Sequence, residues 1–520
     1  MKPMRAAALW LFLLMLGGCA VLPENVERRP SSAIADREAT PLGRAWHSDP
    51  HSAEGLSAFH LLGNGLDAFV ARAALARVAT RSIDLQYYMI HDDHVGTLLM
   101  YEVLKAADRG VRVRILLDDI DEGHRDFRMA AFDLHPNIEV RIFNPFGRNV
   151  SRLWQYVTGF GRQTRRAHNK SFTVDNMATI LGGRNIGDEY FERDPDLAFQ
   201  DLDVMGIGPV AWEVSRSFDA YWNHELSYPA PLLAKHRPTR EDYLRLRRAF
   251  ESRVGELKHS EYLRRLQGSP LATRLQAGHL DYAWARSRVF ADPPDKLLRA
   301  PGEDQSRLVD DLLPYLESAK RELIVASPYF VPGKAGTAFF RRLRERGVKV
   351  RILTNSLAST DVSIVHAGYV RYRRALLRMG VELWELNRVT SREERKEMRE
   401  GYVGKSKSSL HAKAFVVDRK TLFIGSLNLD PRSVVQNTEI GVVIESPELA
   451  REVAHSFDRD VPKEAFRLEL DEDPETGQER ILWHGRMNGR SAVLESEPHA
   501  GFWRKLGIFF LRWLPIESQI

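Results

Sequence analysis

Two stretches of the sequence repeat the same chemically active residues at the same spacing. In each, a histidine is followed two residues later by a lysine and five residues after that by an aspartate: His168, Lys170 and Asp175 in the first, His411, Lys413 and Asp418 in the second. A histidine can attack phosphorus or transfer a proton, and a lysine neutralises phosphate oxygens. The pattern predicts a phosphoryl-transfer site to which each stretch contributes one half.

Each stretch is expected to form a β-hairpin. The runs 171–174 and 178–181 have the composition of strands and flank a turn at Asp175-Asn176, and the second stretch repeats this pattern around Asp418. With pairing symmetric about the turn, the expected facing pairs are His168 with Asn185, Lys170 with Gly183, His411 with Asn428, and Lys413 with Ser426. Each hairpin would then present an imidazole, an ammonium and an amide on one face, although a bulge would shift this register.

The two hairpins form one site if the halves of the chain pack face to face. A histidine would then stand on each side of a single phosphorus, and the two lysines would neutralise its equatorial oxygens. This arrangement suits in-line displacement, in which one histidine becomes a phospho-histidine and the other protonates the leaving alcohol. The expected phosphate-binding residues are Asn185, Ser426 and Asn428. Because the lysines carry the positive charge, we expect no cofactor and no metal.

Four carboxylates accompany these residues in matched pairs. Asp201 and Glu439 follow the two hairpins at corresponding places and are expected to orient the imidazoles and stabilise their protonated forms. Asp175 and Asp418 complete the repeated pattern and are candidate catalytic residues by that pattern. Their position at the predicted turns favours a role in stabilising the turn instead.

A longer repeat surrounds the two hairpins. Residues 109–117 return almost unchanged as 346–354, each copy after a helix-like segment that itself follows a strand ending in tyrosine. Strand, helix, glycine turn and strand form a βαβ unit, which implies a parallel or mixed sheet covered by helices. We therefore expect an N-terminal α/β domain over 46–228, a helical connector over 229–300, a C-terminal α/β domain over 301–470 and a C-terminal segment over 471–520.

Composition sets limits on the partners. The 520 residues include 75 Lys and Arg against 70 Asp and Glu, a net charge of +5, so the chain is not built for bulk nucleic-acid binding. The one cysteine excludes an internal disulfide framework, cysteine zinc sites and iron–sulfur clusters. The acidic cluster at 118–122 resembles a metal site only superficially, since no histidine pattern flanks it.

The start of the chain is typical of an export signal. Residues 1–18 have a basic start, a short apolar run and small residues, and the ending before Cys19 resembles the bacterial lipoprotein box. In that box the cysteine is acylated and becomes the mature N-terminus, so we expect a membrane-anchored protein of the bacterial cell envelope. Residues 19–45 then read as a tether. The alternative is an ordinary signal peptide with a chance cysteine, and the choice between inner and outer membrane stays open.

Both hairpin stretches resemble the phospholipase D superfamily, and the stretch 182–191 is similar to bacterial cardiolipin synthases of the C type. The resemblance implies two tandem α/β domains related by pseudo-two-fold symmetry, with mixed sheets flanked by helices and one active site at their interface. It also implies that His168 is the nucleophile and His411 the general acid. Gly183 departs from the pattern, because many members have serine there.

Three features favour a lipid substrate within this superfamily. They are the anchor at Cys19, the aromatic and basic tail at 502–515, and an insertion at 148–166 whose arginines and aromatics could hold anionic headgroups. The insertion would also suit single-stranded nucleic acid. The tail could equally close the fold as a packed helix.

The sequence therefore predicts a phosphatidyltransferase that makes cardiolipin at a membrane surface. Phosphatidylglycerol would be the acceptor, with phosphatidylethanolamine as a further candidate substrate, and no stable nucleic-acid complex is expected. The alternatives are a phospholipase D-type hydrolase of lipid or nucleic acid, and a lipid-binding lipoprotein scaffold with a decayed site. The intact histidines, lysines and asparagines in both halves argue against decay.

Overall fold

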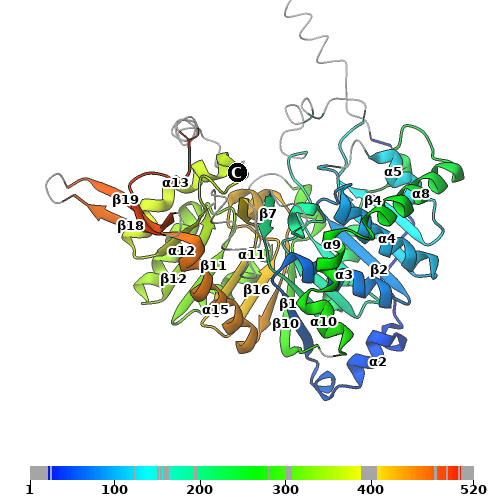
Figure 1. Cartoon of the computed structure of the whole chain (residues 1–520), viewed down its shortest axis with the longest axis horizontal. Coiled ribbons are helices and arrows are strands. Elements are labelled where there is room, and N and C mark those ends of the chain that lie inside the picture. The colour runs from blue at the N-terminus through cyan, green and yellow to red at the C-terminus, as the bar shows by residue number, and fades with distance from the viewer. Residues whose placement is uncertain are drawn as a thin grey trace, which may run out of the picture.

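The computed structural model describes residues 22–23, 26–121, 125–148, 152, 155, 163–192, 197–278, 280–299, 307–387, 407–473, 477–487, 490–501 and 504. Two α/β halves lie side by side, the N-terminal half on the right of Figure 1 and the C-terminal half on the left. Their strands join in one sheet of eighteen strands. The predicted architecture of two similar mixed sheets flanked by helices is confirmed.

The sheet of the N-terminal half combines parallel and antiparallel strands. Its order is β9-β4-β3-β2-β5-β6-β8-β1, with β2, β3 and β4 parallel. The strands are β1 (Ser57–Leu62), β2 (Ser82–Tyr87), β3 (Arg112–Asp118), β4 (Ile138–Phe143), β5 (Ser171–Val174), β6 (Ala178–Gly182), β8 (Asp203–Ile207) and β9 (Ser227–Pro229). The helices that cover it are α3 (Gly65–Val78), α4 (His94–Asp108), α5 (Asp126–Phe132) and α7 (Pro209–Trp222).

The C-terminal half repeats this order as β18-β13-β12-β11-β15-β16-β17-β10. Its strands are β10 (Ala283–Ala291), β11 (Glu322–Ala326), β12 (Lys349–Asn355), β13 (Glu382–Leu386), β15 (Ala414–Val417), β16 (Thr421–Gly425), β17 (Ile440–Glu445) and β18 (Ala465–Glu472), which β19 (Glu479–Met487) and β20 (Arg490–Leu494) extend. Its helices are α11 (Arg307–Glu317), α12 (Gly333–Glu345), α13 (Ser363–Arg378) and α15 (Pro447–Glu464). Equal strand order in both halves is what a duplicated domain requires.

The connector between the halves is helical only in part. Helices α8 (Arg240–Leu257), α9 (Glu261–Gln267) and α10 (Pro270–Gln276) agree with the prediction, whereas β10 is a strand within the predicted helical range. It pairs antiparallel with β1 on one side and with β17 on the other. The prediction is wrong there because β10 is the strand that joins the two sheets. A second junction is the parallel pair β7 (Leu197–Gln200) and β14 (Lys407–Leu410), one strand from each half.

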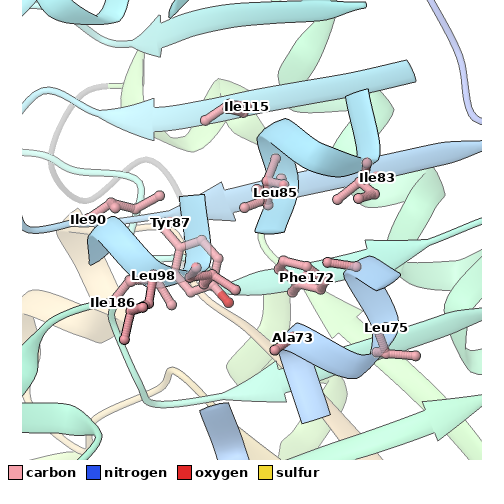
Figure 2. Packing of buried hydrophobic residues seen from close by; sticks show 14 of the residues in the cluster. Ala73, Leu75, Ile83, Leu85, Tyr87, Ile90, Leu98, Ile115, Phe172 and Ile186 are labelled. Atoms are coloured by element: carbon pink, nitrogen blue, oxygen red, sulfur yellow. The ribbon is translucent and has the colours of Figure 1, made fainter. Parts of the chain in front are cut away.

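The core of the N-terminal half forms between the sheet and helices α3 and α4. Figure 2 shows Leu85 and Tyr87 of β2 packed with Leu75 of α3, Leu98 of α4 and Phe172 of β5, all buried. Since Phe172 alternates with residues on the opposite face of β5, this packing sets which side chains of the strand face the other way. The core therefore orients the hairpin that begins at residue 171.

The N-terminal segment is bound to the body rather than loose. Residues 19–45 were expected to be a tether. From Arg28 onward, however, buried arginines and Asp219 of α7 form hydrogen bonds with the backbone of this segment. Arg114 and Arg141 donate to the carbonyls of Ser31 and Arg29, and the segment continues into η1 (Arg37–Ala39) and α2 (Pro41–His47). Cys19 and the greater part of the tail at 502–515 lie outside the described residues.

The remaining short elements are η2 (Pro50–Glu54), η3 (Asp188–Tyr190), η4 (Ala230–Leu232), η5 (Pro294–Leu297) and η6 (Arg432–Gln436). Within the described part of the chain, no helix has the length and apolar character needed to cross a membrane.

Candidate active site

The two predicted histidines occupy equivalent positions, each just before the first strand of its hairpin. The backbone N–H of His168 donates to the carbonyl of Thr438 in the other half at 2.9 Å, and that of His411 donates to the carbonyl of Gln200 at 2.8 Å. Each half therefore holds the histidine-bearing segment of the other through the main chain. This reciprocal pairing places both segments at the interface between the halves.

Each imidazole is held by a carboxylate from the opposite half. Nδ1 of His168 lies 2.8 Å from Oε2 of Glu439, and Nδ1 of His411 lies 2.6 Å from Oδ2 of Asp201. All four side chains are buried. With Nδ1 turned to a carboxylate, Nε2 is the ring atom that faces the other way, the orientation needed for attack or proton transfer. The pairing is crossed between the domains, which the matched positions in the sequence did not reveal.

The two lysines lie beside the histidines that precede them. Nζ of Lys170 donates to the carbonyl oxygen of His168 at 2.7 Å, and Nζ of Lys413 donates to that of His411 at 2.5 Å. Both ammonium groups are buried. Two buried positive charges next to two imidazoles form a site for an anionic group such as a phosphodiester.

The predicted register of the hairpins is wrong by one residue. Val174 pairs with Ala178 and Val417 with Thr421, so that Lys170 falls opposite Gly182 and not Gly183. The turn hydrogen bond from Met177 N to Val174 O leaves Met177 as an extra residue on the return strand. The predicted pairing, with Val174 opposite Thr179, leaves two residues between the turn and the first pair, where the structure has this one.

The two aspartates of the motif stabilise the hairpins from outside the site. Asp175 and Asp418 have positive φ angles of 53° and 52° at the turns. The Asp175 carboxylate accepts hydrogen bonds from the backbone of Thr80, Arg81 and Ser82 at the start of β2. The Asp418 carboxylate accepts the equivalent set from Lys320, Arg321 and Glu322. Each aspartate thus ties its turn to the neighbouring strand, and neither contacts a histidine of the site.

The halves differ at the residue where the superfamily pattern has serine. Ser426 Oγ donates to Oε2 of Glu439 at 2.5 Å and so supports the carboxylate that holds His168. In the other half a Cβ atom on Gly183 would lie only 2.5 Å from Oδ1 of Asp201. Glycine at this position therefore makes room for the carboxylate that holds His411.

The two predicted asparagines are buried and similarly placed. Asn185 Nδ2 donates to the Tyr190 hydroxyl at 2.9 Å, and Asn428 Nδ2 lies 3.4 Å from Ser433 Oγ. The amide oxygens of both residues are buried and have no hydrogen-bond partner among the described residues. Since amide oxygen and nitrogen can exchange places by rotation, each side chain can turn a donor toward a ligand.

Two tyrosines that the sequence analysis did not assign to the site pack against its histidines. Tyr88 lies edge-on to His168 with ring centroids 5.0 Å apart, and Tyr190 lies edge-on to His411 at 5.2 Å. Tyr88 follows β2, and a tyrosine at a strand end is too common to mark a site by itself. The packing restricts the rotation of both imidazole rings.

Electrostatics distinguish the two histidines. Burial, together with the charges of Lys170, Lys413 and His411, lowers the pKa of His168 well below its usual range. Burial also lowers the pKa of His411, but there the Asp201 carboxylate opposes the change. His168 is therefore suited to be neutral and nucleophilic, and His411 is the more easily protonated of the two.

The charged partners of the histidines are shifted as well. Burial lowers the pKa of Lys170 to about 7 and that of Lys413 to about 8. Burial raises the pKa of Glu439 to about 7. Burial would raise the pKa of Asp201, but the charges of His411 and Lys413 outweigh it and lower that pKa. The site is therefore close to charge balance before a phosphate enters.

The arginines of the insertion are committed to internal contacts. Arg166 pairs with Asp118, whose carboxylate also accepts from the backbone N–H of Ala167, and Arg148 pairs with Asp119 and Asp126. Arg152 and Arg165 donate to backbone carbonyls. The expectation that these arginines hold headgroups is therefore wrong for the four that are described. Residues 149–151, 153–154 and 156–162 of the insertion lie outside the described residues.

The described residues include one grouping with ligand atoms close enough to hold a metal ion: His91, Asp93 and Glu189. It was not found in the sequence, because Glu189 lies far from the other two along the chain. Oε1 of Glu189 lies 3.1 Å from Nδ1 of His91, so the grouping is already an ion pair when the histidine is protonated.

Both halves of the chain are similar to known proteins. The family described as "Cardiolipin synthase, PLD-like domain" matches residues 74–222 and 312–461, once in each half. The chain belongs to this family. It is 42% identical over 458 residues to a protein of Escherichia coli (strain K12) named Cardiolipin synthase C, an alignment that covers 88% of this chain and 94% of that protein.

More distant relatives agree with this assignment. Cardiolipin synthase A of Pseudomonas fluorescens (strain SBW25) is 26% identical over 434 residues, which cover 83% of this chain and 73% of that protein. Among solved structures, the phosphatidylserine synthase of Haemophilus influenzae Rd KW20 has the same fold. It superposes with a TM-score of 0.53 at 12% identity and covers 92% of this chain and 99% of that one.

Proposed function

We propose that this chain is a phosphatidyltransferase that makes cardiolipin from phosphatidylglycerol through a phospho-histidine intermediate. The observation that carries the proposal is the crossed pairing of His168 with Glu439 and of His411 with Asp201, beside two buried lysines. Two oriented imidazoles and two cations are the groups needed to exchange one phosphodiester for another. Membership of the cardiolipin synthase family and 42% identity to Cardiolipin synthase C support this substrate class.

In the first step His168 acts as the nucleophile. Its Nε2 attacks the phosphorus of the donor lipid, the phosphorus–oxygen bond to the headgroup alcohol breaks, and the protonated His411 gives its proton to the leaving oxygen. Lys170 and Lys413 neutralise the charge on the equatorial oxygens. The products are phosphatidyl-His168 and a free alcohol.

In the second step a glycerol hydroxyl of phosphatidylglycerol is the acceptor. His411, now neutral, takes the hydroxyl proton as the oxygen attacks phosphorus, and the bond between phosphorus and His168 breaks. Both histidines return to their starting protonation states. One phosphodiester replaces another, so the exchange is nearly isoenergetic and needs no nucleotide.

An activity assay with the purified protein tests this proposal directly. It should convert phosphatidylglycerol vesicles to cardiolipin and glycerol, measured by mass spectrometry, while His168→Asn should not. Phosphatidic acid without cardiolipin would select a phospholipase D-type hydrolase, and cleavage of nucleic acid without lipid turnover would select a nuclease. Adding phosphatidylethanolamine and measuring free ethanolamine tests the second donor.

For location we propose an exported lipoprotein anchored through Cys19. The basic start, apolar run and small residues before this one cysteine support it. Metabolic labelling with a fatty acid should mark the wild-type chain and fail to mark Cys19→Ser. Labelling of both chains, or of neither, would contradict the anchor.

A further inference from the structure

Three exposed apolar side chains lie on one surface of the N-terminal half. Phe127 is on the outer side of α5, Leu134 lies two residues beyond that helix, and Leu232 ends η4; they are 45%, 42% and 39% exposed. Helix α5 packs on η4, and the exposed face of these two elements that carries the three residues is here named the α5–η4 surface. Exposed large apolar groups gathered on one face indicate an interaction surface.

The N-terminal segment reaches this same surface. Pro23 and Val26 line a hollow together with Leu232 and Asp133, and Leu22 packs against the core of the N-terminal half. From Arg28 onward the segment is fixed, because the Arg28 guanidinium donates to the carbonyls of Ser227 and Glu225. The fold therefore fixes where the N-terminal segment meets the N-terminal half.

The length of chain before Leu22 limits where an anchor at Cys19 can be. Leu22 is the third residue after Cys19, and a fully extended chain spans about 3.5 Å per residue, so Cys19 stays within about 10 Å of Leu22. Acyl chains on Cys19 would draw the bilayer surface to the same distance. The surface beside Leu22 is the α5–η4 surface.

We propose that the α5–η4 surface lies on the bilayer, with Phe127, Leu134 and Leu232 in the interfacial layer. This inference rests on the proposed lipoprotein anchor. Exposed Lys235 and Arg237, which closely follow Leu232, add positive charge suited to anionic headgroups such as that of phosphatidylglycerol. An exposed leucine followed closely by cations has the composition of an interfacial contact.

A chain of ion pairs leads from this surface toward the catalytic histidine. Asp126, the first residue of α5, pairs with Arg148, and Arg148 also pairs with Asp119. The neighbouring Asp118 accepts from the backbone N–H of Ala167, the residue before His168. Asp126 and Phe127 therefore lie toward the end of the sheet that carries His168, whereas Leu134 and Leu232 lie beside the opposite ends of β3 and β4.

Site-directed fluorescence on the mature, full-length chain tests the proposal. Its one cysteine is acylated, so a new cysteine at Phe127→Cys or Leu232→Cys is the one reactive thiol. Leu275→Cys is the matched control, because Leu275 is also a leucine at 39% exposure and α10 lies far from α5 (Figure 1). Each variant is labelled with an environment-sensitive dye and mixed with vesicles of phosphatidylethanolamine and phosphatidylglycerol that contain spin-labelled lipid.

The expected result is that dye at 127 and 232 is quenched at least several-fold more strongly than dye at 275. Equal quenching at all three positions, stronger quenching at 275, or no quenching in vesicle-bound protein would overturn the inference. A parent chain that takes up dye at Cys19 would lack the anchor and would overturn it as well. Cardiolipin formation, measured on the same samples, reports the proposed activity separately: quenching without turnover would refute the activity and leave the surface in place.

Discussion

Nδ1 of His411 lies 2.6 Å from Oδ2 of Asp201, a carboxylate that comes from the other half of the chain. His168 and Glu439 make the reciprocal contact at 2.8 Å. Neither domain therefore contains a complete histidine–carboxylate pair. Both histidine–carboxylate pairs exist only when the two halves are packed together.

Removing either carboxylate should slow turnover while leaving the fold in place. In Asp201→Asn and Glu439→Gln the imidazole loses a negatively charged partner, and we expect kcat to fall by about 100-fold. The measurement is cardiolipin formation at saturating phosphatidylglycerol. Asp281→Asn, at an exposed position, is the control and should keep full activity. An unchanged kcat in both site variants would show that the carboxylates do not orient the histidines.

Gly183 should tolerate no side chain. In Gly183→Ala the added methyl group would meet Oδ1 of Asp201 at 2.5 Å, displace the carboxylate and leave His411 misplaced. We expect kcat to fall at least about 10-fold. Gly255→Ala is the matched control, since a Cβ there has nothing within 4 Å. Equal activity of the two variants would mean that the carboxylate has freedom to move.

Asp175 should affect stability rather than chemistry. Its carboxylate accepts hydrogen bonds from three successive residues at the start of β2, and Asp175→Asn leaves at least one of these donors without a partner. We expect a loss of about 2 kcal/mol in the free energy of unfolding, seen as a lower urea midpoint. Activity per folded molecule should stay within about threefold of wild type. A collapse of kcat with an unchanged midpoint would instead make Asp175 catalytic.

The pH dependence should follow the buried lysines and Glu439. As pH rises through about 7 and 8, Lys170 and Lys413 lose their protons and the free enzyme loses its affinity for an anionic phosphodiester. As pH falls below about 7, Glu439 becomes protonated and no longer holds His168 as a carboxylate. We therefore expect kcat/KM to follow a narrow bell-shaped curve against pH. The alkaline decrease in kcat should occur at higher pH than that in kcat/KM, because bound phosphate stabilises the charged lysines. A flat kcat/KM between roughly pH 6 and 10 would contradict these assignments.

Much of this site could be predicted from residue types and spacing. The histidines, lysines and turns recur at fixed intervals, and local alternation along a strand decides which side chains share a face. The carboxylates could be found because Asp201 and Glu439 follow the hairpins at corresponding places. That each carboxylate pairs with the histidine of the other domain could not be predicted. This pairing depends on how the domains pack, and no local sequence pattern indicates it.

Other features depend on contacts that sequence patterns do not contain. The register of the hairpin depends on how many residues lie between the turn and the first pair, which is one (Met177), and no residue type at the turn marks this number. Strand β10 carries arginines within a polar stretch whose composition favours a solvated helix, and only its pairing with β1 and β17 shows that it is a strand. The arginines before His168 look like a basic patch, and only the structure shows that Asp118 and Asp119 neutralise Arg166 and Arg148.

The central claim is that His168 carries the phosphatidyl group between donor and acceptor. The most direct measurement starts by mixing the enzyme with phosphatidylglycerol and stopping the reaction rapidly without acid. Peptide mass spectrometry then locates the covalent adduct. The account predicts a phosphatidyl group on the peptide that contains His168, and none in His168→Asn. An adduct on His411, or cardiolipin formation by His168→Asn at the wild-type rate, would contradict it.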